Sequence, residues 1–361
     1  QGVPIIEGFG VEDVKTVPLA PWPRVGGKGA FVQLYGMEGV TGMYLVEIPA
    51  GGSLEPEKHL YEEELVVLKG NGLTEVWQDG GRKQLFEWGE GSVFAPPGNT
   101  WHRLINGTNE PARLMGVTTA PLLMDLLHNT DFIFNCEHQF PERFSGEDGY
   151  FAAGDKRYQS GRFHSNLWET NFIPDVRQAS IDAHEVKGSG VHITVFEMAG
   201  NSLIGHMSEW PEGRYHKAHY HGPGAILYIL SSEGYVLIWP KDAGVRPYEN
   251  GRGEDVVEFH WKPGSIYCPP SGWFHQHLNT GPEPARQLAL RFGSRHHPVE
   301  FELAMRRQEE GVLCSIREGG TLIEYDDEDP EIRRRFEAAL KAKGIESQMP
   351  AVTYRTDHVT V

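Results

Sequence analysis

Short apolar runs alternate with turns rich in glycine and proline over the first 120 residues of the chain. Runs of this length at close, regular spacing are typical of the strands of a sandwich or barrel. The turn segments Gly70-Asn71-Gly72 and Asp79-Gly80-Gly81 have the chemistry of hairpin turns. We therefore expect strands at residues 43–48, 64–68, 73–78, 92–95, 102–105 and 113–118.

The same pattern occurs a second time in the chain. Residues 43–77 match residues 205–239 at a constant offset, and the second copy then continues through a longer hairpin over 241–258. After that hairpin the match resumes, so that His102 aligns with His275. Internal similarity of this kind indicates that one fold unit has been duplicated. Each unit is expected to form a barrel whose interior has room for one ion and a small ligand.

The remaining segments differ from these two units. Residues 122–182 are rich in aromatic side chains without clear periodicity, and we expect them to pack across the two barrels or to cover an opening. Residues 299–309 have helical spacing. A second helix is predicted over 331–343, because Asp329 can cap it and Pro330 can occupy its first position. The apolar face of this second helix suits docking or dimerisation.

The composition supports a mostly β protein built from more than one unit. The chain has 361 residues, of which 43 are glycine and 24 are proline, and these residue types favour short strands and turns over long helices. The expected fold class is all-β with a minor α part. We divide the chain into a first barrel, an aromatic-rich connecting segment, a second barrel and a C-terminal helical extension, at residues 1–125, 126–182, 183–297 and 298–361.

Charge and cysteine content argue against several classes of protein. The net charge of −17 is unfavourable for a nucleic-acid partner, since phosphate binding needs a basic surface. The three cysteines are widely spaced, which fits a reducing compartment better than a disulfide framework or a zinc knuckle. No apolar run approaches the roughly 18 to 20 residues of a membrane span, and the segment after Gln1 lacks the layout of a signal peptide. We therefore expect a cytoplasmic protein with no membrane partner.

Candidate chemistry is concentrated in residues 213–225, where three histidines precede an apolar run. His219 and His221 are two residues apart. Alternate side chains of a β-strand point to the same face, so both imidazoles could reach one metal ion. His216 would need a bend in the chain to join them.

This stretch and its counterparts resemble the two sequence motifs of the cupins. The first cupin motif is Gly, five residues, His-x-His, three or four residues, Glu, six residues, Gly. The second motif runs from a glycine through Pro-x-Gly to a histidine and an asparagine. The second copy matches with Gly213, His219, His221 and the segment Gly264 to Asn279, but it carries Ala225 where the family has glutamate. The first copy matches with Gly51, His59, Glu63, Gly70 and the segment Gly91 to Asn106, with Glu57 in place of the leading histidine.

The resemblance covers residues 26–120 and 188–292 and implies two tandem double-stranded β-helix barrels of jelly-roll type, as in a bicupin. It places metal ligands at His219, His221 and His275 in the second barrel, and at Glu57, His59, Glu63 and His102 in the first.

The two implied ligand sets differ in chemistry. Since Ala225 provides no carboxylate, the second barrel keeps three neutral nitrogens, and such a set suits Fe(II). His277 shares a strand face with His275 and is expected to act as a reserve ligand or as the catalytic acid or base. The mixed oxygen and nitrogen set of the first barrel could hold Mn(II), Fe(II) or Zn(II).

Our main functional interpretation is an Fe(II) dioxygenase that activates O2 in the second barrel against a small aromatic, diketone or carboxylate substrate. One alternative is a redox-neutral Mn or Zn decarboxylase, isomerase or lyase, with Glu57 or Glu63 of the first barrel as acid or base. A further alternative is a non-catalytic bicupin of the small-molecule-binding or storage type. The partner is expected to be a small molecule, and the bicupin resemblance together with the C-terminal helix predicts a homo-oligomer.

Overall fold

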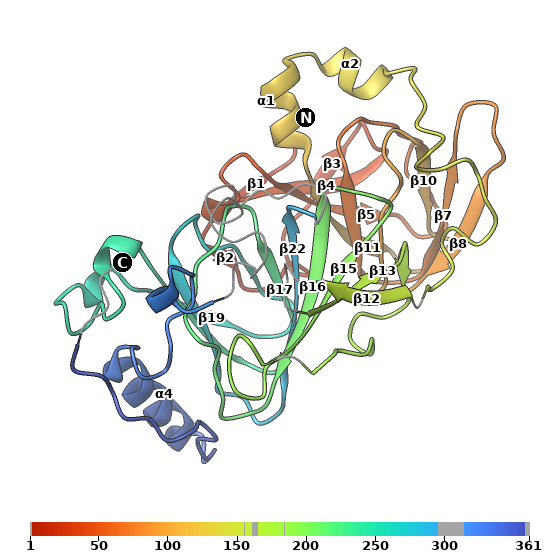
Figure 1. Ribbon diagram of the computed structural model, residues 1–361. Coiled ribbons are helices and arrows are strands. Elements are labelled where there is room, and N and C mark those ends of the chain that lie inside the picture. Colours follow the sequence, from red (N-terminus) through yellow and green to blue (C-terminus); the bar gives the residue numbers. More distant parts are fainter. Residues whose placement is uncertain (1, 155, 161–164, 184, 295–313, 358–361) are drawn as a thin grey trace.

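The computed structural model describes residues 2–154, 156–160, 165–183, 185–294 and 314–357 (Figure 1). Within these residues, strands dominate over helices and form two barrels in the order of the chain. The helix predicted over 299–309 lies outside the described residues.

The first barrel packs a large sheet against a small one. In spatial order, the large sheet contains β1 (Ile5–Gly8), β4 (Gly27–Leu34), β5 (Gly42–Ile48), β11 (Ala112–Thr118), β6 (Glu63–Lys69), β9 (Val93–Phe94) and β14 (Phe172–Ile173), with β3 (Ala20–Trp22) paired to β4. The small sheet contains β10 (Trp101–Ile105), β7 (Gly72–Trp77) and β8 (Gln84–Trp88). Val46 and Leu65 of the large sheet and Leu104 of the small sheet belong to one apolar core.

The second barrel repeats this arrangement. Its large sheet contains β12 (Lys156–Ser160), β13 (Ser165–Glu169), β15 (His192–Glu197), β16 (Leu203–Trp210), β22 (Ala285–Phe292), β17 (Ile226–Ser231), β20 (Ile266–Tyr267) and β2 (Gly10–Val11). Its small sheet contains β19 (Val257–Trp261), β18 (Gly234–Trp239) and β21 (Phe274–Asn279). A further apolar cluster, which includes Leu45, Met115, Phe196 and Leu288, joins the large sheets of the two barrels.

The expectation of a duplicated β-barrel is confirmed. The six strands predicted in the first unit are all present, and their ends differ from the prediction by at most one residue. Strand β8 was not predicted, because its Leu85 points outward with 60% of its surface exposed and obscures the alternation. The longer hairpin of the second unit contains two short 3-10 turns, η2 (Lys241–Ala243) and η3 (Gly253–Asp255), and two more 3-10 turns lie elsewhere, η1 (Tyr35–Met37) and η4 (Ile316–Glu318).

Two short strands connect segments that are distant in the sequence. Strand β2, close to the N-terminus, pairs with β20 of the second barrel. Strand β14, near the end of the aromatic-rich segment, pairs with β9 of the first barrel. Each barrel therefore includes a strand from outside its own repeat, and the boundaries at 125, 182 and 297 stay a prediction.

Two helices that the sequence pattern did not indicate lie where the first barrel meets the connecting segment, α1 (Ala120–Leu127) and α2 (Thr130–Asn135). They lie together at the top of Figure 1, over one end of the first barrel. Asn129 caps α2 by accepting a hydrogen bond from the backbone of Phe132 at 3.0 Å. Helices this short contain too few turns for an apolar periodicity to show. None of the helices in the described residues is long and apolar enough to cross a membrane.

The predicted C-terminal helix is present as α4 (Pro330–Ala342), with Asp329 as its N-cap. Its buried residues Ile332, Phe336 and Leu340 belong to one apolar cluster with Tyr215 and Trp239 of the second barrel. The apolar face therefore docks on its own chain. The prediction of a homo-oligomer consequently depends on the bicupin resemblance alone.

A buried carboxylate lies behind strand β21, where the C-terminal extension meets the second barrel. Glu328 is 2% exposed, accepts a hydrogen bond from the hydroxyl of Tyr215, and accepts another from Gln276 Nε2 at 3.1 Å. Burial raises the pKa of Glu328 to about 7, against a smaller opposing effect of these hydrogen bonds. The folded protein therefore keeps Glu328 largely protonated below about pH 7, where an ordinary glutamate is ionised.

We predict that replacing Phe336 by alanine lowers the free energy of unfolding by about 3–5 kcal/mol, because the substitution leaves a cavity in a fully buried cluster. Denaturant titration followed by circular dichroism measures this change. Lys341→Ala, on the exposed side of the same helix, should change the value by less than about 0.5 kcal/mol. Equal effects of the two substitutions would show that α4 does not dock through this face.

We also predict that Glu328 makes stability fall as pH rises. The folded-state pKa is raised, so the folded protein binds more protons than the unfolded chain between about pH 4.5 and 7. The contribution of Glu328 is complete below pH 4.5 and is lost as pH approaches 7, with a total of about 3 kcal/mol. Urea unfolding at about pH 5 and about pH 7.5 should show a smaller decrease for Glu328→Gln than for the parent protein. An unchanged decrease would contradict this assignment.

Candidate metal centres

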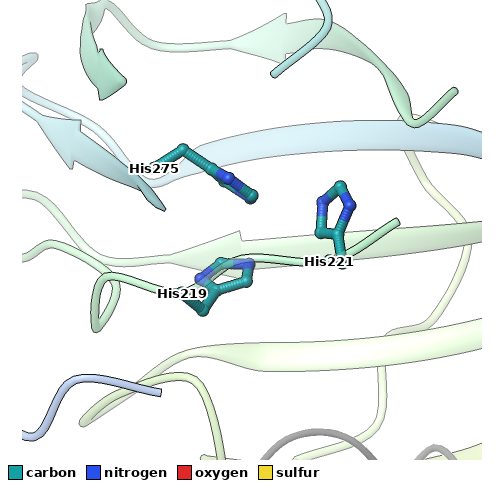
Figure 2. Close-up of side chains that lie close together, drawn as sticks. All are labelled: His219, His221 and His275. Atoms are coloured by element: carbon teal, nitrogen blue, oxygen red, sulfur yellow. The ribbon is translucent and has the colours of Figure 1, made fainter. Parts of the chain in front are cut away.

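Three histidines converge at one end of the second barrel. His219 and His275 form an isolated antiparallel bridge, with backbone N to O distances of 3.0 and 2.8 Å in the two directions. The ring centroid of His275 lies 4.4 Å from that of His219 and 4.6 Å from that of His221 (Figure 2). The expectation that His219 and His221 occupy a regular strand is wrong, because only isolated bridges form here, from His219 to His275 and to Leu322. The two rings nevertheless face the same site.

Hydrogen bonds to the backbone orient these three imidazoles. Each Nδ1 lies near a main-chain carbonyl oxygen, at 3.0 Å from Lys217, 2.8 Å from Gly222 and 3.1 Å from Trp273. An Nδ1–H donor leaves a lone pair on Nε2, which is the tautomer that binds metals. Within the described residues, Nε2 of His219 and of His275 is buried and has no hydrogen-bond partner.

The electrostatics favour neutral rings in this triad. Burial is the main cause that lowers the pKa of His221 to about 3, and it holds the pKa of His219 and His275 well below the usual value. One nitrogen from each ring can be chosen so that all three lie within 4.8 Å of one another. The donor set thus fits a divalent metal, and no carboxylate of the described residues joins it, in keeping with Ala225.

His277 lies below the triad, inside the barrel. Its ring centroid is 5.4 Å from that of His275 and 5.9 Å from that of His219. Its Nδ1 is 2.7 Å from the hydroxyl of Tyr267, which donates to Gln287 Oε1 at 3.2 Å. The structure therefore places His277 in an interior hydrogen-bond network beside the triad, and its proposed role as acid or base remains a prediction.

His216, which the motif spacing left out, belongs to the same interior. It is fully buried, its ring centroid lies 5.0 Å from that of His277, and both its nitrogens are without a hydrogen-bond partner among the described residues. The sequence repeat also identifies the polar residues inside the second barrel. At five positions an apolar core residue of the first barrel aligns with a buried polar residue of the second: Val46 with Ser208, Leu54 with His216, Phe94 with Tyr267, Leu104 with His277, and Leu114 with Gln287.

The first barrel brings together three of its four expected ligands. Glu63 Oε1 lies 3.1 Å from His102 Nε2 and 3.5 Å from His59 Nε2. His59 belongs to the loop before β6, Glu63 is the first residue of β6, and His102 is in β10. The three side chains are at most 5% exposed, and their donor atoms lie within 4.8 Å of one another.

Neighbouring groups hold this triad in place. His59 Nδ1 is 2.7 Å from the carbonyl oxygen of Tyr61, and the ring of Tyr61 stacks on His59 with centroids 3.6 Å apart. His102 Nδ1 is 3.3 Å from the carbonyl oxygen of Thr100. Tyr44 donates a hydrogen bond to the second carboxylate oxygen of Glu63 at 2.8 Å. These contacts direct the free Nε2 lone pairs and Glu63 Oε1 toward a common point.

The charges in the first barrel also fit a cation. Burial would raise the pKa of Glu63, but the imidazoles of His59 and His102 outweigh it and hold that pKa well below the usual value. For His102, burial lowers the pKa and the contact with Glu63 more than compensates, so the pKa is raised. The raised pKa favours a proton on Nε2 of His102, facing the carboxylate of Glu63. A divalent cation would take the place of this proton, since the imidazole nitrogen and the carboxylate oxygen are both metal donors.

Glu57 is outside the triad. Its carboxylate pairs with Arg24, and its other oxygen is 3.9 Å from His102 Nε2. A backbone bridge holds Glu57 next to His102, with N to O distances of 3.0 and 2.9 Å. The prediction of Glu57 as a ligand is therefore not matched by its position here, because the guanidinium of Arg24 competes for its carboxylate.

A cavity of about 520 Å³ adjoins this triad at the mouth of the first barrel. Tyr44 and Tyr61 form part of its wall and also touch the triad. Trp22 and Phe31 extend the aromatic lining, and Phe134 of α2 contributes to it. The connecting segment therefore helps to cover an opening of the first barrel, as the sequence suggested.

Comparison with known proteins agrees with this architecture. Residues 44–118 match the cupin domain family model. A single-residue variant of oxalate decarboxylase from Bacillus subtilis superposes with a TM-score of 0.50 at 13% identity, over 80% of this chain and 78% of that chain. A second oxalate decarboxylase structure, described by its substrate binding mode and a reaction specificity switch, has the same four values. No curated protein gives a significant match to the sequence.

The fold and its two histidine clusters define a two-barrel β-protein with a candidate metal centre in each barrel. The first barrel matches the cupin domain family over residues 44–118, and the chain as a whole has a two-barrel fold like that of the solved structures. At 13% identity the likeness to the solved structures shows the fold alone.

We predict that metal binding is lost separately in the two barrels. His102→Ala should weaken binding in the first barrel at least about 10-fold, and His275→Ala should do the same in the second, because each removes one of three donors. Elemental analysis after dialysis measures the metal retained by each variant. His260→Ala is the control, since this side chain is 74% exposed and belongs to neither triad. Unchanged metal content in both ligand variants would contradict the assignment.

Proposed function

We propose that the protein is a metal-dependent, redox-neutral enzyme that acts on a small carboxylate in the first barrel, as a decarboxylase or lyase. The observation that carries this proposal is the convergence of His59, Glu63 and His102 beside a cavity of about 520 Å³. A pocket with mostly apolar walls and a few convergent polar groups is the usual form of a small-molecule site.

The donor set supports a divalent metal of the Mn(II) type. Two imidazoles and one carboxylate form a mixed nitrogen and oxygen set, which suits Mn(II) and also accepts Fe(II) or Zn(II). A bound divalent cation would stabilise negative charge that develops on a substrate oxygen. His59, Glu63 and His102 would hold it, and the contacts of Tyr61 and Tyr44 would keep His59 and Glu63 oriented.

The residues around the triad would exclude water, position the substrate and transfer a proton. The aromatic walls, including Trp22 and Phe31, exclude water and position an apolar substrate. Breaking a carbon–carboxylate bond releases CO2 and leaves an electron pair on carbon, which then takes up a proton. Glu57 lies at the edge of the triad without being one of its three residues, and we assign the proton transfer to its carboxylate.

The comparison with solved structures is compatible with this reaction class. The structural neighbour is named as an oxalate decarboxylase, so a two-barrel chain of this fold can host the decarboxylation of a small carboxylate. The redox-neutral interpretation therefore has more support than the dioxygenase interpretation that the three-histidine motif favoured.

A second candidate function remains for the second barrel. Its three neutral imidazoles, without a carboxylate, form the set expected for an Fe(II) dioxygenase. The interior network of His277 and Tyr267 lies directly below this set. This candidate requires O2 and depends on His219 and His275, whereas the first does not.

We predict turnover without oxygen. A panel of small carboxylates incubated with the Mn(II)-loaded protein under argon should release CO2 or an eliminated product at the same rate as in air. His102→Ala should lower that rate at least about 100-fold, because it removes a donor of the first-barrel set. His260→Ala should leave it unchanged. Turnover that needs O2 and is abolished by His275→Ala instead would contradict the first-barrel proposal and support the dioxygenase.

A further inference from the structure

Arg24 lies at the mouth of the first barrel, in the turn between β3 and β4. The backbone N–H groups of Val25 and Gly26 both donate to the carbonyl oxygen of Trp22 at 3.1 Å, and Gly26 has a φ of 74°. This tight turn projects Arg24 over the cavity, which it lines. Its guanidinium carbon lies 5.1 Å from the ring centroid of Trp22 and 5.3 Å from that of Phe134.

The cavity has one positive group among the described residues that line it. That group is Arg24, whose side chain is 27% exposed, and Glu7 is the other charged member of the lining. A partly buried guanidinium needs an anionic partner, and its fork of N–H donors matches a carboxylate. In this structure Glu57 is that partner, through a single oxygen.

The two copies of the repeat indicate that Arg24 and Glu57 belong together. At the offset that aligns residues 43–77 with 205–239, Glu57 corresponds to His219 and Arg24 to Val186. The second barrel therefore has no anion at the position of Glu57, and its nearby cation is Lys187, one residue beyond the counterpart of Arg24. A cation and an acid that occur together in only one copy, beside its cavity, form the arrangement expected of a ligand-binding pair.

We propose that Arg24 recognises the substrate, by binding the carboxylate of an apolar monocarboxylate whose ring or branched chain packs on Trp22, Phe31 and Phe134. Glu57 is the internal counter-ion that the carboxylate replaces on Arg24. A two-carbon dicarboxylate would fill only a small part of a cavity of about 520 Å³ and would leave its aromatic walls without contact. This inference rests on the proposed function in that it takes the first-barrel cavity as the substrate site.

Isothermal titration of the full chain with benzoate and with benzamide tests the proposal. The two probes share a shape and differ in charge, so benzoate should bind at least about 10-fold more tightly than benzamide. Arg24→Gln should remove that preference, and Arg24→Lys should keep part of it because the charge remains without the fork. Arg82→Gln, at an arginine whose side chain is 61% exposed, should bind like the parent protein.

The variant Glu57→Gln distinguishes substrate recognition by Arg24 from a purely structural role of this side chain. The neutral amide no longer competes for the guanidinium, so benzoate should bind about 10-fold more tightly than to the parent protein. Thermal melting of every variant confirms that the chain is folded. The proposal is overturned if benzoate shows no heat at millimolar concentration, if benzamide binds equally well, or if Glu57→Gln weakens benzoate binding.

Failure of this inference and failure of the proposed function give different results. Benzoate binding that depends on Arg24, in a protein whose metal content and turnover do not depend on His102, supports the carboxylate subsite and removes the enzymatic proposal. Turnover that depends on His102, with benzoate binding that ignores Arg24→Gln, overturns the subsite alone.

Discussion

One backbone bridge in each barrel organises everything else at the two candidate sites. Glu57 pairs with His102 in the first barrel, and His219 pairs with His275 in the second. Each bridge joins the loop that carries the first motif to the strand that carries the second, so residues more than forty positions apart share one small volume. Together with a second bridge in each loop, Ser53 with Ile105 and Tyr215 with Leu278, it holds the imidazoles at the fixed distances that metal binding requires.

Both barrels have this bridge, but their interiors differ in polarity. The first keeps an apolar core below its triad and opens into an aromatic cavity above it. The second replaces five of those core residues by polar ones, including His216 and Gln287, and several of their polar atoms lack a partner among the described residues. Buried polar groups are costly unless they are hydrogen-bonded, so an interior of this kind is a functional feature or a hydrated one.

The first barrel also depends on segments outside the repeat. Helices α1 and α2 place Met124 and Phe134 in the wall of its cavity, and the turn after β3 adds Arg24. The cavity wall therefore combines residues of the repeated unit, such as Tyr44 and Tyr61, with residues of the two helices that follow it. This explains how one duplicated scaffold can offer two sites of different chemistry, an acidic one beside a cation and a neutral one of three imidazoles.

The sequence by itself determined the duplicated β-barrels, the first-unit strands to within one residue, the C-terminal helix and the side chains that cluster in the two triads. These features follow from local periodicity, turn chemistry and motif spacing. The sequence did not reveal that Glu57 turns to Arg24 or that two short helices cover the first barrel. Those outcomes depend on which side chains meet across long loops, where a competing partner such as Arg24 can redirect a carboxylate. Contacts of that kind are a property of the packed structure, and spacing along the chain carries no trace of them.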